Sequence, residues 1–466
     1  MLIDLLNDPD AKVRNTAIKT SIKRFNDEVI YALIDNLNNP QFSNQAMNAL
    51  VLIGGRALQH LENAFYRTGQ STQTLIRIVR ILGRIGGQRA KDLLWGKIDY
   101  HDKVVVSQVL LSLGECGFKA GISQITRIKY AIESDVADIS WNLNAIQEIG
   151  SAGRAGDLKE ALRYENQNDI EHIYMLLAML YDTRSIQLVK ENIESGTTEG
   201  STYAVELLDV FLSEQLKQRV IPVLDDLTDA EKINRLEVLY PRIRLDEKLI
   251  LKFLLNRDLT QSNRWSKACV LHQIGFLRVA EFKLDLIAQL FNPDPLIQEV
   301  AAWALFQIEP EWYHENVLRL SEENQDALNE VIRSGKSSKL MRFEVIRFFS
   351  SSRVFTGIPG ITLSFLADIA EEVRIAQQQT LVLDEQMNQN FYMLYEGSAA
   401  YYAKGSFKGN FERGDFIGEM LSAPGHANLH MIMASDDVIL LKINKEQYYE
   451  LLSDNVKLAE RILEYL

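Results

Sequence analysis

The chain has 466 residues, with 63 acidic and 50 basic side chains, and its formal net charge is −13. This balance excludes a general nucleic-acid binder, which needs basic surface to displace counterions from phosphates. A chain of this length is expected to form two or more domains. Two distant cysteines and no signal-peptide pattern favour the reducing cytoplasm, and no apolar run approaches the ~18 residues of a membrane span.

The first three-quarters of the chain has a period near 32 residues. Apolar-glycine pairs end successive amphipathic runs at Gly54, Gly86, Gly117 and Gly150, and the pattern resumes at Gly275 after a degenerate middle. Glycine after the last apolar residue of a helix is the left-handed C-cap signal. A period of this length predicts stacked helix pairs, each of which buries its apolar face against its neighbours.

The turn between paired helices is also readable. Residues 7–17 (NDPDAKVRNTA) match the Asp-Pro-x-x-x-Val-Arg-x-x-Ala turn of HEAT repeats, and residues 292–302 (NPDPLIQEVAA) form a looser copy. Proline stops the first helix, and Asp10 or Asp294 is expected to cap the second. Residues 1–335 therefore resemble an all-α HEAT-like solenoid. Because the first helix is only about a turn and a half long, the chain is expected to begin inside a repeat and to come from a longer protein.

This helical part shows no catalytic cluster in its sequence. Its histidines are scattered and share no motif; they are His60, His101, His172, His272 and His314. We therefore expect no catalytic residue, metal site or cofactor, and a scaffold whose concave face binds an unknown protein partner.

The helical rhythm breaks at residues 333–339 (RSGKSSK), the best candidate for a linker. Beyond it, the pattern predicts short strands near residues 373–376, 380–383, 391–395, 399–403 and 438–443, followed by a helical tail from Lys445. The predicted fold is thus multidomain: a helical solenoid over residues 1–335, then an α+β domain with a β jelly roll over residues 340–466.

Three motifs of this second domain resemble the cyclic nucleotide-binding domain family. They are residues 354–358 (VFTGI), the strand and turn at 391–397 (FYMLYEG), and the phosphate-binding cassette at 413–420 (RGDFIGEM). The resemblance implies a ligand pocket formed by Gly418, Glu419, Met420, Leu421 and the residue ten positions after Gly418.

One residue that the family's cassette needs is missing. The family places an arginine ten residues after the cassette glycine to pair with the cyclic phosphate, and this chain has Asn428 there. Residues 385–388 (EQMN) and Gln379 also depart from the family's glycine-containing pattern. We therefore expect a degenerate pocket that does not bind cyclic nucleotides in the family's manner. His426 and His430 stand at i,i+4 spacing, but exposed loop histidines without a role are the expected reading.

The order of the two domains resembles the soluble C-terminal extension of some bacterial transporters of the ATP/ADP carrier type. The predicted function is a non-catalytic cytoplasmic regulatory or scaffold module, and the resemblance implies that a longer parent tethers it to a membrane domain. One alternative is a true cyclic-nucleotide sensor whose ligand moves the C-terminal helix. A second alternative is a helical-repeat enzyme, either a lyase or a glycosylase.

Overall fold

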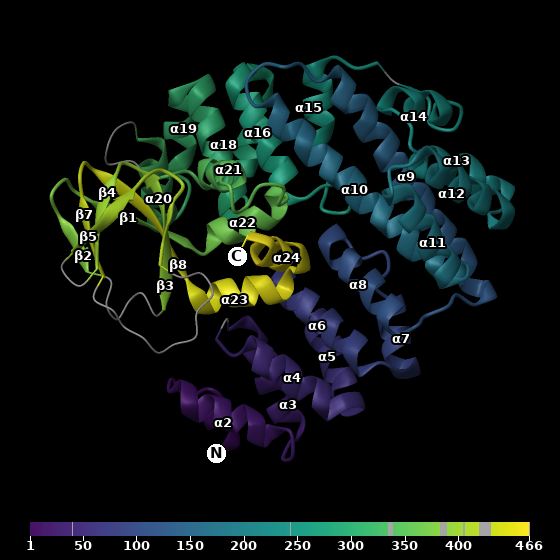
Figure 1. Cartoon of the computed structure of the whole chain (residues 1–466), viewed down its shortest axis with the longest axis horizontal. Coiled ribbons are helices and arrows are strands. Elements are labelled where there is room, and N and C mark those ends of the chain that lie inside the picture. Colours follow the sequence, from purple (N-terminus) through teal and green to yellow (C-terminus); the bar gives the residue numbers. More distant parts are fainter. Residues whose placement is uncertain are drawn as a thin grey trace. The chain divides into compact units, whose positions relative to one another are not determined.

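A computed structural model describes residues 1–39, 41–242, 244–333, 339–382, 389–403, 406–418 and 430–465. The chain divides into two compact units, Met1–Gln273 and Ile274–Leu466 (Figure 1). The division falls within helix α16 (Arg264–Leu277). The domain boundary predicted at 335–340 lies inside the second unit and stays a prediction, because residues 334–338 are outside the described part of the chain.

The first unit is helical, and no strand occurs among its described residues. Its helices are α1 (Leu2–Leu6), α2 (Ala11–Ser21), α3 (Asp27–Asp35), α4 (Ser43–Ile53), α5 (Leu58–Phe65), α6 (Thr72–Ile85), α7 (Gly87–Trp95), α8 (Lys103–Glu115), α9 (Ile122–Glu148), α10 (Ala155–Leu180), α11 (Thr183–Glu194), α12 (Thr198–Phe211), α13 (Glu214–Leu224), α14 (Asp229–Leu236) and α15 (Glu247–Leu255). Up to α8 they pack in two rows. In one row α1, α3, α5 and α7 contact in turn, and in the other α2, α4, α6 and α8 do so.

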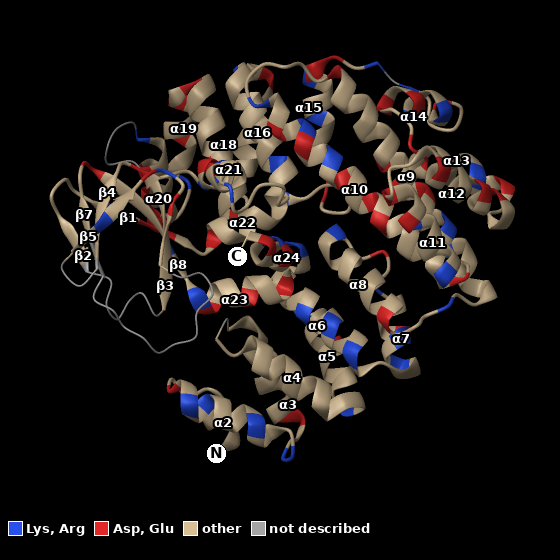
Figure 2. Cartoon of the chain, in the orientation of Figure 1, with Lys and Arg blue, Asp and Glu red and all other residues tan. Residues whose placement is uncertain are grey.

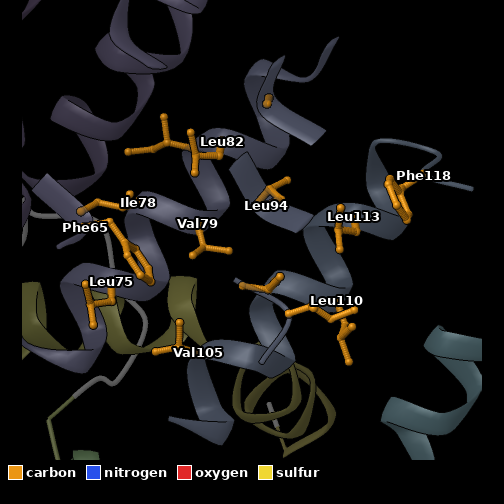
Figure 3. Close-up of a cluster of buried hydrophobic side chains, with 14 of the residues drawn as sticks. Phe65, Leu75, Ile78, Val79, Leu82, Leu94, Val105, Leu110, Leu113 and Phe118 are labelled. Carbon is orange, nitrogen blue, oxygen red and sulfur yellow. The ribbon is translucent and has the colours of Figure 1, made fainter. Parts of the chain in front are cut away.

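A continuous apolar core fills the space between these rows. Figure 3 shows side chains of this core from α5 to α8, among which Phe65, Ile78, Leu82 and Leu113 are at most 2% exposed. Removing such side chains from water is the main driving force for packing the helices, at ~25 cal/mol per Å² of apolar surface. Charged side chains of both signs are intermingled over the helices rather than gathered on one of them (Figure 2).

The predicted helix ends are largely confirmed. Gly54, Gly86 and Gly117 follow or end their helices with positive φ angles of 68°, 65° and 61°. Gly150 follows α9 without a positive φ. A Cβ at Gly150 would lie 3.0 Å from Oε2 of Glu247, so a close approach, and not a left-handed turn, distinguishes that position.

The two proline-containing turns behave as predicted in their capping, but Gly275 does not end a helix. Asp10 accepts hydrogen bonds from the backbone N–H groups of residues 12 and 13, and Asp294 accepts one from Leu296. Gly275 lies inside α16, where an added Cβ would come within 2.8 Å of Ala304 on α18 (Pro295–Ile308). The glycine therefore permits close packing of two helices.

The described residues of the second unit form eight strands and a further set of helices. Its further helices are α17 (Lys283–Leu290), α18, α19 (Pro310–Val317), α20 (Glu322–Ile332), α21 (Arg342–Ser351), α22 (Gly360–Asp368), α23 (Lys445–Asp454) and α24 (Val456–Tyr465). Its strands are β1 (Ala370–Ile375), β2 (Thr380–Val382), β3 (Asn390–Glu396), β4 (Ala399–Ala403), β5 (Ser406–Phe411), β6 (Phe416–Ile417), β7 (His430–Ala434) and β8 (Val438–Asn444).

The strands form two antiparallel four-stranded sheets, with orders β1-β8-β3-β6 and β2-β7-β4-β5. Side chains from both sheets share one core, in which Tyr392, Leu394 and Leu440 of the first sheet meet Ala399 and Ile432 of the second. The five strands predicted from the sequence are confirmed as β1, β2, β3, β4 and β8, whereas β5, β6 and β7 were not predicted. None of the helices in the described part of the chain is both long and apolar enough to cross a lipid bilayer.

Candidate functional site

The described part of the predicted cassette is a tight turn fastened to strand β3. The N–H of Gly414 donates to the carbonyl of Leu394 at 2.8 Å, and the N–H of Leu394 donates to the carbonyl of Asp415 at 3.0 Å. Within the turn, the Asp415 carboxylate accepts a hydrogen bond from the N–H of Glu412 at 2.8 Å. Aspartate closes turns in this way because its short side chain reaches nearby backbone donors. The aspartate of the Gly-Asp-Phe string therefore has a structural role.

Arg413, in the same turn, packs against two aromatic side chains. Its guanidinium lies 5.0 Å from the ring centres of both Phe348 and Tyr395, and Nη1 donates to the carbonyl of Tyr395 at 3.0 Å. Burial raises the pKa of the Tyr395 hydroxyl, as does nearby Glu344, whereas Arg413 lowers it. Arginine over aromatic faces is a stabilising arrangement. Arg413 is thus engaged in packing against the aromatic side chains beside the turn.

Gly418 and helix α23 both lie against one residue, Phe391. Gly418 has a φ of 101°, and a Cβ there would lie 3.5 Å from the Cα and Cβ of Phe391. The Phe391 ring packs edge-on against Tyr448 of α23, with centroids 4.9 Å apart, and also contacts Phe416. Burial raises the pKa of Tyr448, whose hydroxyl makes no hydrogen bond among the described residues. Gly418 thus lies near the Cα and Cβ of Phe391, and α23 packs against the ring of the same residue.

Of the predicted pocket residues, the structure describes only Gly418. Glu419, Met420, Leu421 and Asn428 lie outside the described residues, as do His426 and the turn at 385–388. Their roles stay predictions. The structure does describe the strands on either side of them. Strand β6 lies within the cassette and ends at Ile417, and strand β7 begins at His430.

The family's pattern has a glycine where this chain has Gln379, and the structure has a left-handed backbone at the preceding residue, Gln378. Gln378 has a φ of 67°, a left-handed conformation that costs a residue with a Cβ about 1–2 kcal/mol. The turn is held because the Gln378 N–H donates to the carbonyl of Ala434 at 2.9 Å and the Gln379 N–H donates to that of Ala376 at 2.9 Å. The backbone conformation that favours glycine is therefore found at Gln378, two residues before β2, where the chain has glutamine.

A second cluster of polar groups, in the first unit, was missed by the sequence analysis. His172, which was treated as one of several scattered histidines, lies with Asp135, Asp169 and Lys103 on the facing surfaces of α8, α9 and α10. A signal was present: Asp135 and Asp138, and likewise Asp169 and His172, stand at i,i+3 spacing and so share a helix face. The spacing alone does not reveal that the two faces meet.

No family model matches the sequence, and no curated protein matches it. Solved structures match part of it. The regulatory subunit of a cAMP-independent protein kinase A from Trypanosoma brucei is 20% identical over 26% of this chain and 47% of that chain, with a TM-score of 0.23. The sensor domain of the transcriptional regulator DNR from Pseudomonas aeruginosa is 18% identical over 26% of this chain and 89% of that chain, with a TM-score of 0.23.

A cyclic nucleotide-binding-like protein from Brucella abortus is 18% identical over 24% of this chain and 98% of that chain, with a TM-score of 0.20. The chain spans less than half the length of the kinase regulatory subunit. The partial structural neighbours are thus cyclic nucleotide-binding-like domains.

Proposed function

We propose that this chain is a non-catalytic regulatory or scaffold module in which a HEAT-like solenoid carries a cyclic nucleotide-binding-like domain with a degenerate pocket. One observation carries the proposal: the Gly-Asp-Phe-x-Gly turn is fastened to β3 of a two-sheet jelly roll and packs, through Phe391, against the helix that follows the last strand. That is the arrangement the sequence motifs resemble. It supports a regulatory domain whose cassette and C-terminal helix touch the same core residue.

The pocket is degenerate in this proposal because Asn428 replaces the arginine expected opposite a cyclic phosphate. An asparagine carries no charge and cannot form a bidentate pair with phosphate oxygens. Loss of a charge-assisted hydrogen bond costs about 1.5–3 kcal/mol, which corresponds to more than a tenfold loss of affinity. The domain would then act through its surface and its packing, and not through a captured nucleotide.

The two rows of helices in the first unit support the solenoid part of the proposal. Each row packs its members successively, α1 to α7 and α2 to α8, as repeats that contact only their neighbours would. Solenoids bind partners through an extended face, so the partner we infer is another protein. We place the module in the cytoplasm, as the extension of a membrane transporter of the ATP/ADP carrier type. Hydrophobic membrane helices in the reading frame upstream would support that parentage, and their absence would refute it.

A gain-of-function substitution tests the degenerate pocket. Asn428→Arg restores the missing charge, and we expect it to raise the affinity of the full chain for cyclic AMP at least tenfold in equilibrium dialysis. The matched control is Asn410→Arg, which adds the same charge at an exposed position on β5. Equal binding by the two variants would show that Asn428 does not face the phosphate position.

A second candidate function, a true cyclic-nucleotide sensor, is favoured by the shared contact at Phe391. A ligand that moved Gly418 would displace Phe391, whose ring packs against Tyr448 of α23. A ligand shifts such an equilibrium only by its difference in affinity for the two states. The sensor hypothesis therefore requires measurable binding by the wild-type chain.

A further inference from the structure

Six polar side chains from three helices meet in the interior of the first unit. Lys103 and Ser107 come from α8, Asp135 and Asp138 from α9, and Asp169 and His172 from α10, and these three helices contact one another in pairs: α8 with α10, and α9 with α10. The three carboxylates, the ammonium and the imidazole are between 0% and 13% exposed. Burial of so many ionisable groups is costly unless each has a partner.

The charges of this cluster do not balance. Lys103 Nζ lies 2.5 Å from Oδ1 of Asp169 and 3.3 Å from Oδ2 of Asp138. When all groups except histidine are ionised, three negative charges face one positive charge, which leaves the cluster at −2. Asp169 is fully buried, and its Oδ2 accepts no hydrogen bond among the described residues.

The imidazole of His172 is oriented by its neighbours. Its Nε2 lies 2.7 Å from Oγ of Ser107. Because that hydroxyl donates its own proton to the carbonyl of Lys103 at 3.0 Å, its oxygen can accept an N–H from Nε2, which leaves Nδ1 unprotonated. The other nitrogen, Nδ1, faces Asp135 and lies 3.9 Å from its Oδ1. Histidines that bind metals are oriented in this way, because one ring nitrogen bonds a neighbouring group and the other is directed at the ion.

Potential ligand atoms of Asp135, Asp169 and His172 lie within 4.8 Å of one another. A cavity of about 370 Å³ adjoins them and is lined by Asp135, His172 and Lys103 together with Tyr130 and Arg127. Asp135 is the most exposed of the three, at 13%, so the cavity gives access to the cluster from the side of α9. Two carboxylate oxygens and one imidazole nitrogen make a mixed set that suits a divalent transition metal, whereas Ca²⁺ takes 6–8 oxygen ligands.

We propose that Asp135, Asp169 and His172 form a binding site for one divalent transition-metal ion, of which Zn²⁺ is the representative. The ion brings two positive charges to a cluster with two unbalanced negative ones, and it takes the Asp169 oxygen that lacks a partner. Lys103 remains on the other oxygen of Asp169, and Ser107 fixes the imidazole from behind. Helices α9 and α10 are thereby joined at a point where their facing surfaces are polar.

Isothermal titration of the metal-free full chain with ZnCl₂ tests this site, and CoCl₂ serves as a second probe because bound Co²⁺ reports its ligands by visible absorption. We expect one ion per chain. Asp135→Asn and His172→Asn should each lower the affinity at least tenfold, since each removes one of three protein ligands. The matched control is His60→Asn: His60 Nε2 lies 3.1 Å from Oδ1 of Asp27 at the surface, a histidine-aspartate pair without a third ligand, and this variant should bind as wild type does.

Three outcomes would overturn the proposal. The first is no Zn²⁺ binding by the wild-type chain, which needs no variant to interpret. The second is binding that survives both Asp135→Asn and His172→Asn in variants whose circular dichroism matches wild type. The third is binding that is lost in a variant with both His426→Asn and His430→Asn, because the ion would then occupy the i,i+4 pair in the other unit. Each result leaves the proposed function untouched, so the two ideas fail separately.

Discussion

Gly86 ends α6 in a conformation that other residues rarely adopt. Its φ is 65° and its ψ is −162°, a region open to glycine because it has no Cβ, and its N–H donates to the carbonyl of Leu82 at 3.1 Å. Gly114, one helix pair later, is the contrast: it lies inside α8 without a positive φ, and nothing lies within 4 Å of where its Cβ would be. The same residue type thus has opposite consequences for stability at the two positions.

Alanine substitutions at the two glycines should therefore have opposite signs. We expect Gly86→Ala to lower the free energy of unfolding by about 1–3 kcal/mol, because alanine is strained at that φ and ψ. Gly114→Ala should raise it by about 0.5–1 kcal/mol, because glycine is the more costly residue inside a helix. Urea denaturation followed by circular dichroism measures both. Two changes of the same sign would contradict the assignment of Gly86 as a required helix end.

At the scale of the element, Glu165 of α10 binds the segment Ser262–Asn263, which directly precedes α16. Oε1 of the fully buried Glu165 accepts hydrogen bonds from Oγ of Ser262 at 3.1 Å and from the N–H of Asn263 at 3.1 Å. Arg257 lies 3.8 Å from Oε2 of Glu165 and donates to Oδ1 of Asn142 on α9 at 2.7 Å. One carboxylate thus connects α10 to the chain between α15 and α16. Burial raises its pKa, and Arg257 opposes the shift.

This raised pKa fixes the sign of a pH effect. The unfolded chain loses the Glu165 proton near the ordinary pKa of 4.5, whereas the native state retains that proton to a higher pH. The native state then binds more protons, so stability falls as pH rises through the raised pKa. We expect the stability of wild type relative to Glu165→Gln to decrease as the pH rises above the ordinary pKa of 4.5, as measured by urea denaturation.

Glu160→Gln is the control for this measurement, because it removes the same charge from an exposed position on the same helix. Other buried carboxylates contribute equally to wild type and variant, so their effects cancel in the difference. If both variants gave the same pH profile relative to wild type, the burial of Glu165 would not be what sets the effect.

Which elements could be predicted follows from their local chemistry. The caps at Asp10 and Asp294 are short-range devices, and the strands β3 and β8 are rich in aromatic and β-branched residues, so both were found from sequence. Strand β5 (Ser406–Phe411) contains three polar residues and a glycine and is mostly exposed, and β6 has only two residues, so neither has a strong pattern. Their pairing with β4 and β3 depends on partners elsewhere in the chain.

The same distinction applies to the candidate sites. The cassette was recognised because its residues are consecutive, from Arg413 to Met420. The cluster around Asp169 is drawn from three helices whose residues are up to 69 positions apart, from Lys103 to His172, and no local pattern shows that these faces meet. Gly275 was misread for a related reason, since its requirement comes from Ala304 and not from its neighbours in sequence.

At the scale of the whole molecule, each unit carries a site of a different kind. The unit Met1–Gln273 holds a buried polar cluster between helices, and the unit Ile274–Leu466 holds a jelly roll with a cassette turn. Both units have cores of their own. The function proposed here depends on the second site being unable to retain a cyclic nucleotide, because the module then acts through protein surfaces.

Calorimetric titration of the wild-type full chain with cyclic AMP and cyclic GMP tests this claim most directly. With Asn428 in place of an arginine, we expect no binding heat at micromolar ligand for either nucleotide. A dissociation constant below about 10 μM, roughly −7 kcal/mol, for cyclic AMP or cyclic GMP would contradict the account, because another group would then hold the phosphate and the chain would be a sensor.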